Sequence, residues 1–194
     1  MILNFFKHLH MVNKHRYLVF KYCCKCGFPI NGLFHDLSKY SFTEFLEGVK
    51  FYTGDNSPIA NCKKQIGLSK AWLHHQGRNK HHIEYWYDRY NGDVVVMPFK
   101  YAVECVCDKI AATKCYFKQN YNPKLVLNHW EKYGSKVPMN ENIKNFFNSI
   151  FNDLCKKSEK EILNKAYLKS QYEKYVCKNF IFNNDSLYIG NNYL

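Results

Sequence analysis

The stretch Gly32-Leu33-Phe34-His35-Asp36-Leu37-Ser38-Lys39 places an adjacent histidine and aspartate directly after a glycine and an apolar pair. An imidazole nitrogen and a carboxylate oxygen on neighbouring residues can bind the same metal ion. Further side chains of the same kinds lie on both sides of this pair, at His15, His74-His75, His81-His82 and Asp108. This order predicts a metal site gathered from several helices around the histidine–aspartate pair.

The size and composition of the chain favour one compact domain. The chain has 194 residues, of which 46% are hydrophobic and 18% aromatic. We expect a single helical domain over residues 1–178 and a C-terminal tail over residues 179–194. No run of about 18 apolar residues occurs that could span a membrane, and the apolar N-terminus is too short for a signal-peptide core. The sequence therefore predicts a soluble, cytoplasmic protein without a membrane partner.

Charge and cysteine content narrow the functional classes. The net charge of +12 favours anionic partners and is compatible with a nucleotide or a nucleic acid. Nine cysteines are scattered through predicted helices without a secretion signal, which favours reduced thiols over disulfides. Cys23, Cys24 and Cys26 form a cluster, but no second cysteine pair accompanies them, so a cysteine-based zinc site is not expected. The oligomeric state is left open.

The first predicted helix runs from about Asn4 to Cys26 and is closed by Gly27 and Pro29. His15 lies well inside it. Its predicted apolar stripe comprises Phe5, Leu9, Val12, Tyr17, Val19, Phe20 and Cys23.

The segment that carries His35 and Asp36 is predicted to be a turn leading into a short helix. Ser41 and Glu44 have the spacing of a capping box, which indicates a new helix from Ser41 to about Tyr52. Residues 53–58 form a predicted loop rich in turn formers.

The two histidine pairs flank a polar loop, residues 76–80, that contains Gly77. We expect Ser69 to cap the helical piece before this loop, and residues 81–88 to resume as a helix after it. Aromatic neighbours on both sides indicate half-buried histidines, with one member of each pair pointing inward. We favour His75 and His81 as the inward members, with His74 and His82 as the alternates.

A central helix is predicted from Pro98 to about Tyr116, because apolar residues surround most of its circumference. Glu104 and Asp108 lie four residues apart on one face of it. A buried carboxylate is costly unless it is paired or bound to a metal, which makes Asp108 a ligand candidate. Further predicted helices are 123–133, 140–156 and 158–177.

Three strings carry a resemblance to known families: 35–41 (HDLSKYS), 71–75 (AWLHH) and 79–86 (NKHHIEYW). Over about residues 5–130 the chain resembles a bacterial and phage family defined as a domain of unknown function. The wider order of histidines and aspartates is similar to the HD-domain superfamily, all-helical metal-dependent phosphohydrolases with a minority of di-iron oxygenases. This resemblance implies an all-α, HD-domain-like bundle of about six to eight helices.

The resemblance also implies a ligand set. Four residues match the ligands of the superfamily's mononuclear site: His15, His35, Asp36 and Asp108. One histidine of each downstream pair matches the second-metal ligands of dinuclear members, which implies one or two ions per chain. Imidazole and carboxylate together suit Mn, Fe, Co or Ni better than Ca or Mg.

One position departs from the superfamily. Several of its hydrolases have an acidic residue near the attacking water where this chain has Lys39. A lysine there suits a phosphate oxygen, and it leaves the general base open between Glu104, Glu84 and a metal-bound hydroxide.

The superfamily resemblance, with which the chemistry of these residues agrees, implies a metal-dependent phosphohydrolase acting on a nucleotide or a related phosphoester. Lys39, Arg78 and Glu104 are the predicted catalytic residues, and Lys39, Arg78 and Lys80 would bind phosphate oxygens. Trp72, Tyr85 and Trp86 are candidates to line a base pocket. Two alternatives stay open: a di-iron oxygenase on the same scaffold, and a metal-containing module that binds a nucleotide or nucleic acid without turnover.

Overall fold

A computed structural model of the protein describes residues 2–177, and these form ten α-helices joined by short 3-10 and π-helical turns. The first six helices are α1 (Ile2–Lys25), α2 (Pro29–Phe34), α3 (Phe42–Lys50), α4 (Pro58–Ile66), α5 (Lys70–Gln76) and α6 (Phe99–Phe117). The last four are α7 (Pro123–Lys132), α8 (Glu141–Leu154), α9 (Glu159–Ile162) and α10 (Lys165–Tyr172). The 3-10 turns are η1 (Leu37–Tyr40), η2 (Ile83–Trp86), η3 (Lys118–Asn120) and η4 (Gly134–Lys136), and η5 (Glu173–Cys177) is π-helical.

The all-α class is confirmed. Within residues 2–177 the β pairing is limited to an isolated bridge between Tyr87 and Val94. The helices number ten rather than six to eight, partly because the predicted 158–177 helix is divided at Leu163 and Asn164 into α9 and α10. Ser158 forms a capping box with Glu161 at the start of α9. The expected C-terminal tail lies outside the described residues.

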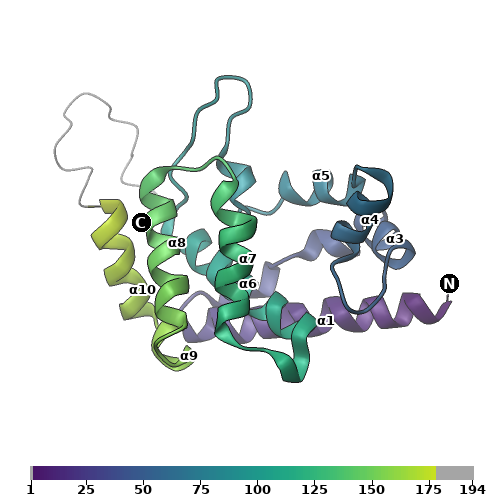
Figure 1. The fold of residues 1–194 in the computed structure, drawn as a ribbon, viewed down its shortest axis with the longest axis horizontal. Helices are drawn as coiled ribbons and strands as arrows, with labels where there is room; N and C mark the ends of the chain where they lie inside the picture. The colour runs from purple at the N-terminus through teal and green to yellow at the C-terminus, as the bar shows by residue number, and fades with distance from the viewer. Residues whose placement is uncertain (1, 178–194) are drawn as a thin grey trace.

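The helix α1 runs along the molecule and carries the other helices on its buried face (Figure 1). Its buried positions follow a spacing of three and four residues, the pattern of one helix face: His8, Val12, His15, Val19 and Tyr22. This face is narrower than the predicted stripe, because Phe5, Tyr17 and Phe20 are exposed. Two histidines therefore occupy core positions of α1.

Two groups of helices pack on α1. The short helices α3, α4 and α5 gather against its first half, whereas α6 packs on its second half with α7, α8 and α10 beyond (Figure 1). The larger group encloses the main core, in which α6 is central as predicted, with every residue from Ala102 to Cys107 buried. The smaller group buries a separate set of apolar side chains, among them Phe45, Val49 and Ala71. His15, at the middle of α1, is positioned between the two groups.

All nine cysteines are free thiols, and six of them are buried, as expected for reduced core residues. Among residues 2–177 no helix is both long and apolar enough to cross a membrane.

Candidate metal centre

His35 and Asp36 lie in the break between α2 and η1, not in a short helix as the sequence suggested. Asp36 has the left-handed backbone conformation, with φ 54° and ψ 27°, which costs a residue with a Cβ about 1–2 kcal/mol. In a helix, successive side chains diverge by about 100°, so a helical pair could not share a target. The break lets both side chains point inward, and each residue is only 1% exposed.

The first ligand cluster joins four side chains from α1, the His35–Asp36 turn and α6. Its ligand atoms all lie within 4.8 Å of one another and belong to His15, His35, Asp36 and Asp108. Nε2 of His15 lies 3.0 Å from Oδ1 of Asp108 and 3.6 Å from Oδ2 of Asp36. Nε2 of His35 lies 3.4 Å from Oδ2 of Asp36 and 3.5 Å from Oδ1 of Asp108. These are the four residues to which the superfamily resemblance assigned the first ion.

The second cluster comprises Asp36, His75, His81 and His82, whose ligand atoms also lie within 4.8 Å of one another. The other carboxylate oxygen of Asp36, Oδ1, is 3.3 Å from Nε2 of His75 and 3.4 Å from Nε2 of His81. Asp36 therefore presents one oxygen to each cluster.

Three histidines rather than two reach this second cluster. His75 and His81 point inward as favoured from sequence, and His82 joins them, whereas His74 turns away and its Nδ1 lies 2.6 Å from Oε1 of Glu44. The predicted helix over residues 81–88 is replaced by a turn that leads into η2. Because neither His81 nor His82 is helical, both members of the pair can face the same point, just as His35 and Asp36 do.

Two glutamates, Glu104 and Glu44, determine which ring nitrogen is free in three of the cluster histidines. Oε1 of Glu104 lies 2.8 Å from Nδ1 of His35 and 3.1 Å from Nδ1 of His81. Oε2 of Glu44 lies 2.7 Å from Nδ1 of His75. An ionised carboxylate only accepts hydrogen bonds, so each of these Nδ1 atoms carries the proton. In the neutral ring the lone pair is then on Nε2, which points into a cluster, and this is the arrangement of metal-binding histidines with outer carboxylates.

In the first cluster, protonated imidazoles balance the carboxylates. Burial opposes protonation of His15 and His35, but the neighbouring carboxylates outweigh it and raise the pKa of His15 well above its usual value and that of His35 to about 9. Burial also disfavours ionised Asp36 and Asp108, yet the adjacent histidines, together with Lys39 beside Asp36, hold both pKa values well below the usual range. The carboxylates thus require positive charge, which a metal ion can supply in place of the imidazolium protons.

In the second cluster, the pKa values of His75 and His82 favour the neutral form of both rings. Burial and then Lys39 lower the pKa of His75, and burial followed by repulsion from His81 and His75 lowers that of His82 well below its usual value. Neutral imidazole is the form that binds metals.

The buried atoms that lack hydrogen-bond partners test whether a cation fits. Oδ1 of Asp36 and the Nε2 atoms of His81 and His82 are buried without a hydrogen bond, and all three residues belong to the second cluster. Buried polar atoms are normally satisfied, so such lone pairs converging on one point indicate a missing positive partner. Ligand atoms bound to one ion at about 2.1 Å stand roughly 3.0–3.4 Å apart, close to the observed separations of 3.0–3.6 Å. The residues fit a cation in both clusters.

The residues predicted to act on the substrate do not all lie beside the clusters. Nζ of Lys39 lies 3.5 Å from Oδ2 of Asp36, at the edge of the first cluster. Arg78 is exposed and donates to the carbonyl of His74, and the ammonium of exposed Lys80 lies over the rings of Tyr85 and Tyr101. The structure thus brings Lys39 to the cluster, and phosphate binding by Arg78 and Lys80 stays a prediction.

Glu104 contacts two histidines of the clusters and an asparagine. Its Oε1 contacts His35 and His81, and its Oε2 accepts a hydrogen bond from Asn31. Burial disfavours its charge, but these histidines outweigh that effect and hold the pKa of Glu104 at about 2. Both oxygens are therefore engaged, and a role of Glu104 as general base stays a prediction.

The residues predicted to line a base pocket also lie in different places. Trp72 packs against the second cluster, with its ring centroid 5.1 Å from that of His82. Trp86 instead donates from its indole to the carbonyl of Lys80 and packs beside Tyr101. Glu84 and Tyr85 lie with Trp86 in η2.

Sequence reasoning missed Glu44 as part of the site. Its position three residues after Ser41 suggested a capping role, and Ser41 does accept from the Glu44 amide. The Glu44 carboxylate, however, turns to His74 and His75. A sequence signal was available, because Glu44 is a carboxylate on the buried face of α3 that needs a partner.

The fold and site together define an all-α protein with two adjacent His/carboxylate clusters that could hold metal ions. The chain belongs to the family of unknown function DUF5662, whose sequence profile matches residues 4–153. No curated protein and no solved structure matches the chain. The match agrees with the resemblance to a domain of unknown function and carries no link to the HD-domain superfamily.

Proposed function

We propose that the protein is a metal-dependent phosphohydrolase with a dinuclear centre, acting on a nucleotide or a related phosphoester. The observation that carries the proposal is the shared carboxylate of Asp36, whose two oxygens face two different sets of histidines. A single ion cannot use all of these ligands, whereas two ions bridged by Asp36 can. The order of the candidate ligands along the chain supports a distant relationship to the HD-domain superfamily. It also supports an HD-like arrangement of the helices.

The ligand sets suit hydrolysis of a phosphoester. Histidine nitrogens and carboxylate oxygens favour Mn, Fe, Co or Ni. When bound, such ions lower the pKa of a coordinated water and neutralise charge on a phosphoryl group. Each cluster has four protein ligands, which leaves positions open for water and substrate at an ion of octahedral preference.

Lys39 is the residue best placed to hold a phosphate oxygen. Burial disfavours its charge, but Asp36 and other nearby acidic groups outweigh burial and raise its pKa, so it is a cation at neutral pH. Its ammonium lies at the rim of the first cluster, with 24% of its side chain exposed. It can therefore meet an anionic substrate without leaving Asp36.

The test combines metal analysis with turnover. Protein purified with and without air is analysed for metals by mass spectrometry and for absorption, then assayed for phosphate release from p-nitrophenyl phosphate and a nucleotide panel with added Mn, Co or Ni. We expect two ions per chain and metal-dependent phosphate release. Lys39→Ala should raise KM, whereas Lys21→Ala, which removes an exposed lysine of α1, should not.

Three results would overturn the proposal, and the first two would each favour a different function. Two irons per chain with charge-transfer bands and oxygen consumption would indicate a di-iron oxygenase. Bound metal with tight nucleotide or nucleic-acid binding and no turnover would indicate a binding module. Failure to bind any of these metals would remove the catalytic reading of the clusters.

A further inference from the structure

We propose that Arg16 is a positioning residue, which holds the His35–Asp36 turn in the conformation where both side chains face the clusters. The inference deepens the proposed function and rests on it for the role of the turn, although the conformation of the turn can be measured without metal. Arg16 is next in sequence to the predicted ligand His15, but its side chain contacts the backbone of the turn instead of joining a cluster.

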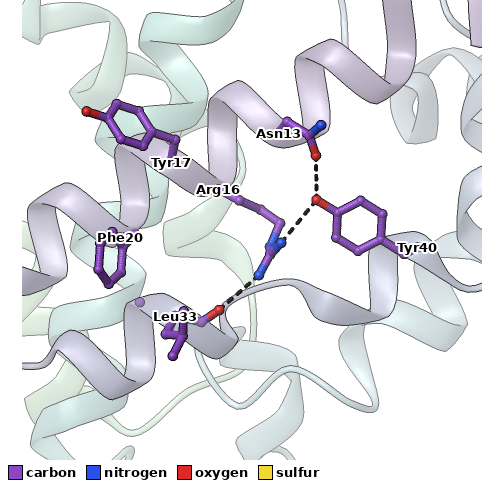
Figure 2. Close-up of a pocket in the computed structure, with 7 residues that line it drawn as sticks. Asn13, Arg16, Tyr17, Phe20, Leu33 and Tyr40 are labelled. Carbon is purple, nitrogen blue, oxygen red and sulfur yellow. Dashed lines mark hydrogen bonds between the residues drawn. The ribbon is translucent and has the colours of Figure 1, made fainter. Parts of the chain in front are cut away.

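One guanidinium group connects three parts of this turn. Nε of Arg16 donates to the carbonyl of His35 at 2.8 Å, and Nη2 donates to the carbonyl of Leu33 at 2.9 Å. Nη1 donates to the hydroxyl of Tyr40 at 3.0 Å, and that hydroxyl donates to Asn13. Figure 2 shows Arg16 reaching from α1 to Leu33 on one side and Tyr40 on the other. The planar group can make such divergent bonds at once, which the point-like ammonium of lysine cannot.

The turn needs this support because its backbone is unfavourable. Asp36 is one of two residues other than glycine with positive φ among the described residues. Carbonyls near a helix end lack donors within the helix, and Arg16 supplies a donor to Leu33 and His35 at the end of α2. The three hydrogen bonds offset the left-handed conformation and fix the direction in which the His35 and Asp36 side chains leave the backbone.

Close packing of α2 on α1 brings the carbonyls within reach. A Cβ atom added at Gly32 would lie 2.7 Å from Cβ of Cys23 and 2.8 Å from Cα of Phe20. A side chain at Gly32 would therefore push α2 away from α1 and lengthen the Arg16 bonds. Gly32 permits the close packing of α2 on α1, and the Arg16 hydrogen bonds depend on that packing.

The hydrogen bonds between Arg16 and the turn are accessible from solution. Arg16 lies in a surface cavity of about 240 Å³ that is also lined by Asn13, Tyr17, Phe20 and Tyr40. When the side chain is removed, a small planar cation can enter this cavity and bond the same carbonyls. This accessibility permits a rescue experiment.

The charge of Arg16 and its positioning role predict opposite changes in metal affinity when the Arg16 side chain is removed. A cation near a metal site repels the metal, so if charge alone mattered, Arg16→Met would tighten metal binding. Loss of the Arg16 hydrogen bonds loosens the His35–Asp36 turn and should weaken metal binding. Loss of an outer hydrogen bond to a ligand typically costs about 10–100-fold in metal affinity, and we expect a loss in this range.

The experiment titrates Co²⁺ into full-length wild type, Arg16→Met, Arg16→Lys and the matched control Lys21→Met, followed by d–d absorption. Both Arg16 variants should bind about 10–100-fold more weakly, and the control should bind like wild type. For Arg16→Ala, added guanidinium should restore affinity, whereas methylammonium should not, because it cannot span the two carbonyls. Circular dichroism verifies that each variant keeps its helices.

Hydrogen exchange provides the readout that does not depend on metal. The amide of Lys39 donates to the carbonyl of Asp36 at 3.0 Å, within the turn. In Arg16→Met this amide should exchange faster than in wild type while the amides of α6 are unchanged. Unchanged exchange at Lys39 would overturn the inference, as would wild-type or tighter Co²⁺ binding in the Arg16→Met variant. If wild type itself failed to bind Co²⁺ while exchange at Lys39 still rose in the variant, the proposed function would fall and the role of Arg16 in the turn would stand.

Discussion

The first cluster takes His15 and Asp108 from the two longest described helices, of 24 and 19 residues, whereas the second takes its histidines from a seven-residue helix and the turn after it. The long helices are fixed by the main core, in which Val19 and Val106 are fully buried. A helix as short as α5 is marginal by itself. The second set of ligands must therefore be held by other means.

Two glutamates on α3 hold α5. Near its C-terminus, Glu44 contacts His74 and His75. At its N-terminus, Glu47 accepts from the Ser69 hydroxyl and from the amides of residues 70 and 71. The helices that supply His15 and Asp108 are thus held by apolar packing, whereas α5 is held by charged hydrogen bonds. We expect the first ion to bind more tightly and to exchange more slowly.

The largest effect should come from the residue that the two clusters share. Asp36→Asn removes the charge of the bridging carboxylate, and we expect both affinities to fall by more than about 100-fold, beyond the usual loss for an outer group. The helical content should stay close to that of wild type. Elemental analysis after dialysis measures the loss, and two retained ions would contradict the bridging role.

The next effect should be confined to one cluster. His75→Ala, His81→Ala and His82→Ala each remove one ligand of the second ion, so each should reduce the stoichiometry from two ions to one. His74→Ala is the matched control, because His74 contacts Glu44 and lies outside both clusters. Loss of an ion in the control as well would show that the pair acts as a unit.

Smaller losses should distinguish the two outer carboxylates. Glu104→Gln disturbs His35 and His81, one histidine of each cluster, so both affinities should fall by about 10–100-fold. Glu44→Gln disturbs only His75 among the ligands, so only the second affinity should fall. Competition with a chelator measures both constants, and equal effects of the two variants would remove the distinction between the clusters.

The smallest effect should follow loss of the anchor of α5. In Glu47→Gln the bonds to the first amides of α5 weaken, at a cost of about 1–2 kcal/mol. The second ion should then bind several-fold more weakly, and the amides of α5 should exchange faster than those of α6. If exchange in α5 did not change, packing on α3 would be sufficient to hold the helix without Glu47.

The sequence by itself determined most of the helices and identified most residues of the two clusters. Caps at Ser41 and Ser69 placed the starts of two helices well, because these signals act over a few residues. The four residues of the first cluster were identified through the superfamily resemblance.

Tertiary structure alone decided the direction of individual side chains. The left-handed Asp36, the inward turn of His82 and the outward turn of His74 depend on partners up to tens of residues away. Glu104 is 69 residues from His35, and Glu44 is 31 residues from His75. Local propensity predicted helix at both ligand pairs, yet helix geometry would have divided each pair between two faces. Burial of several polar groups at one point outweighed that preference, which no pattern within a single segment could reveal.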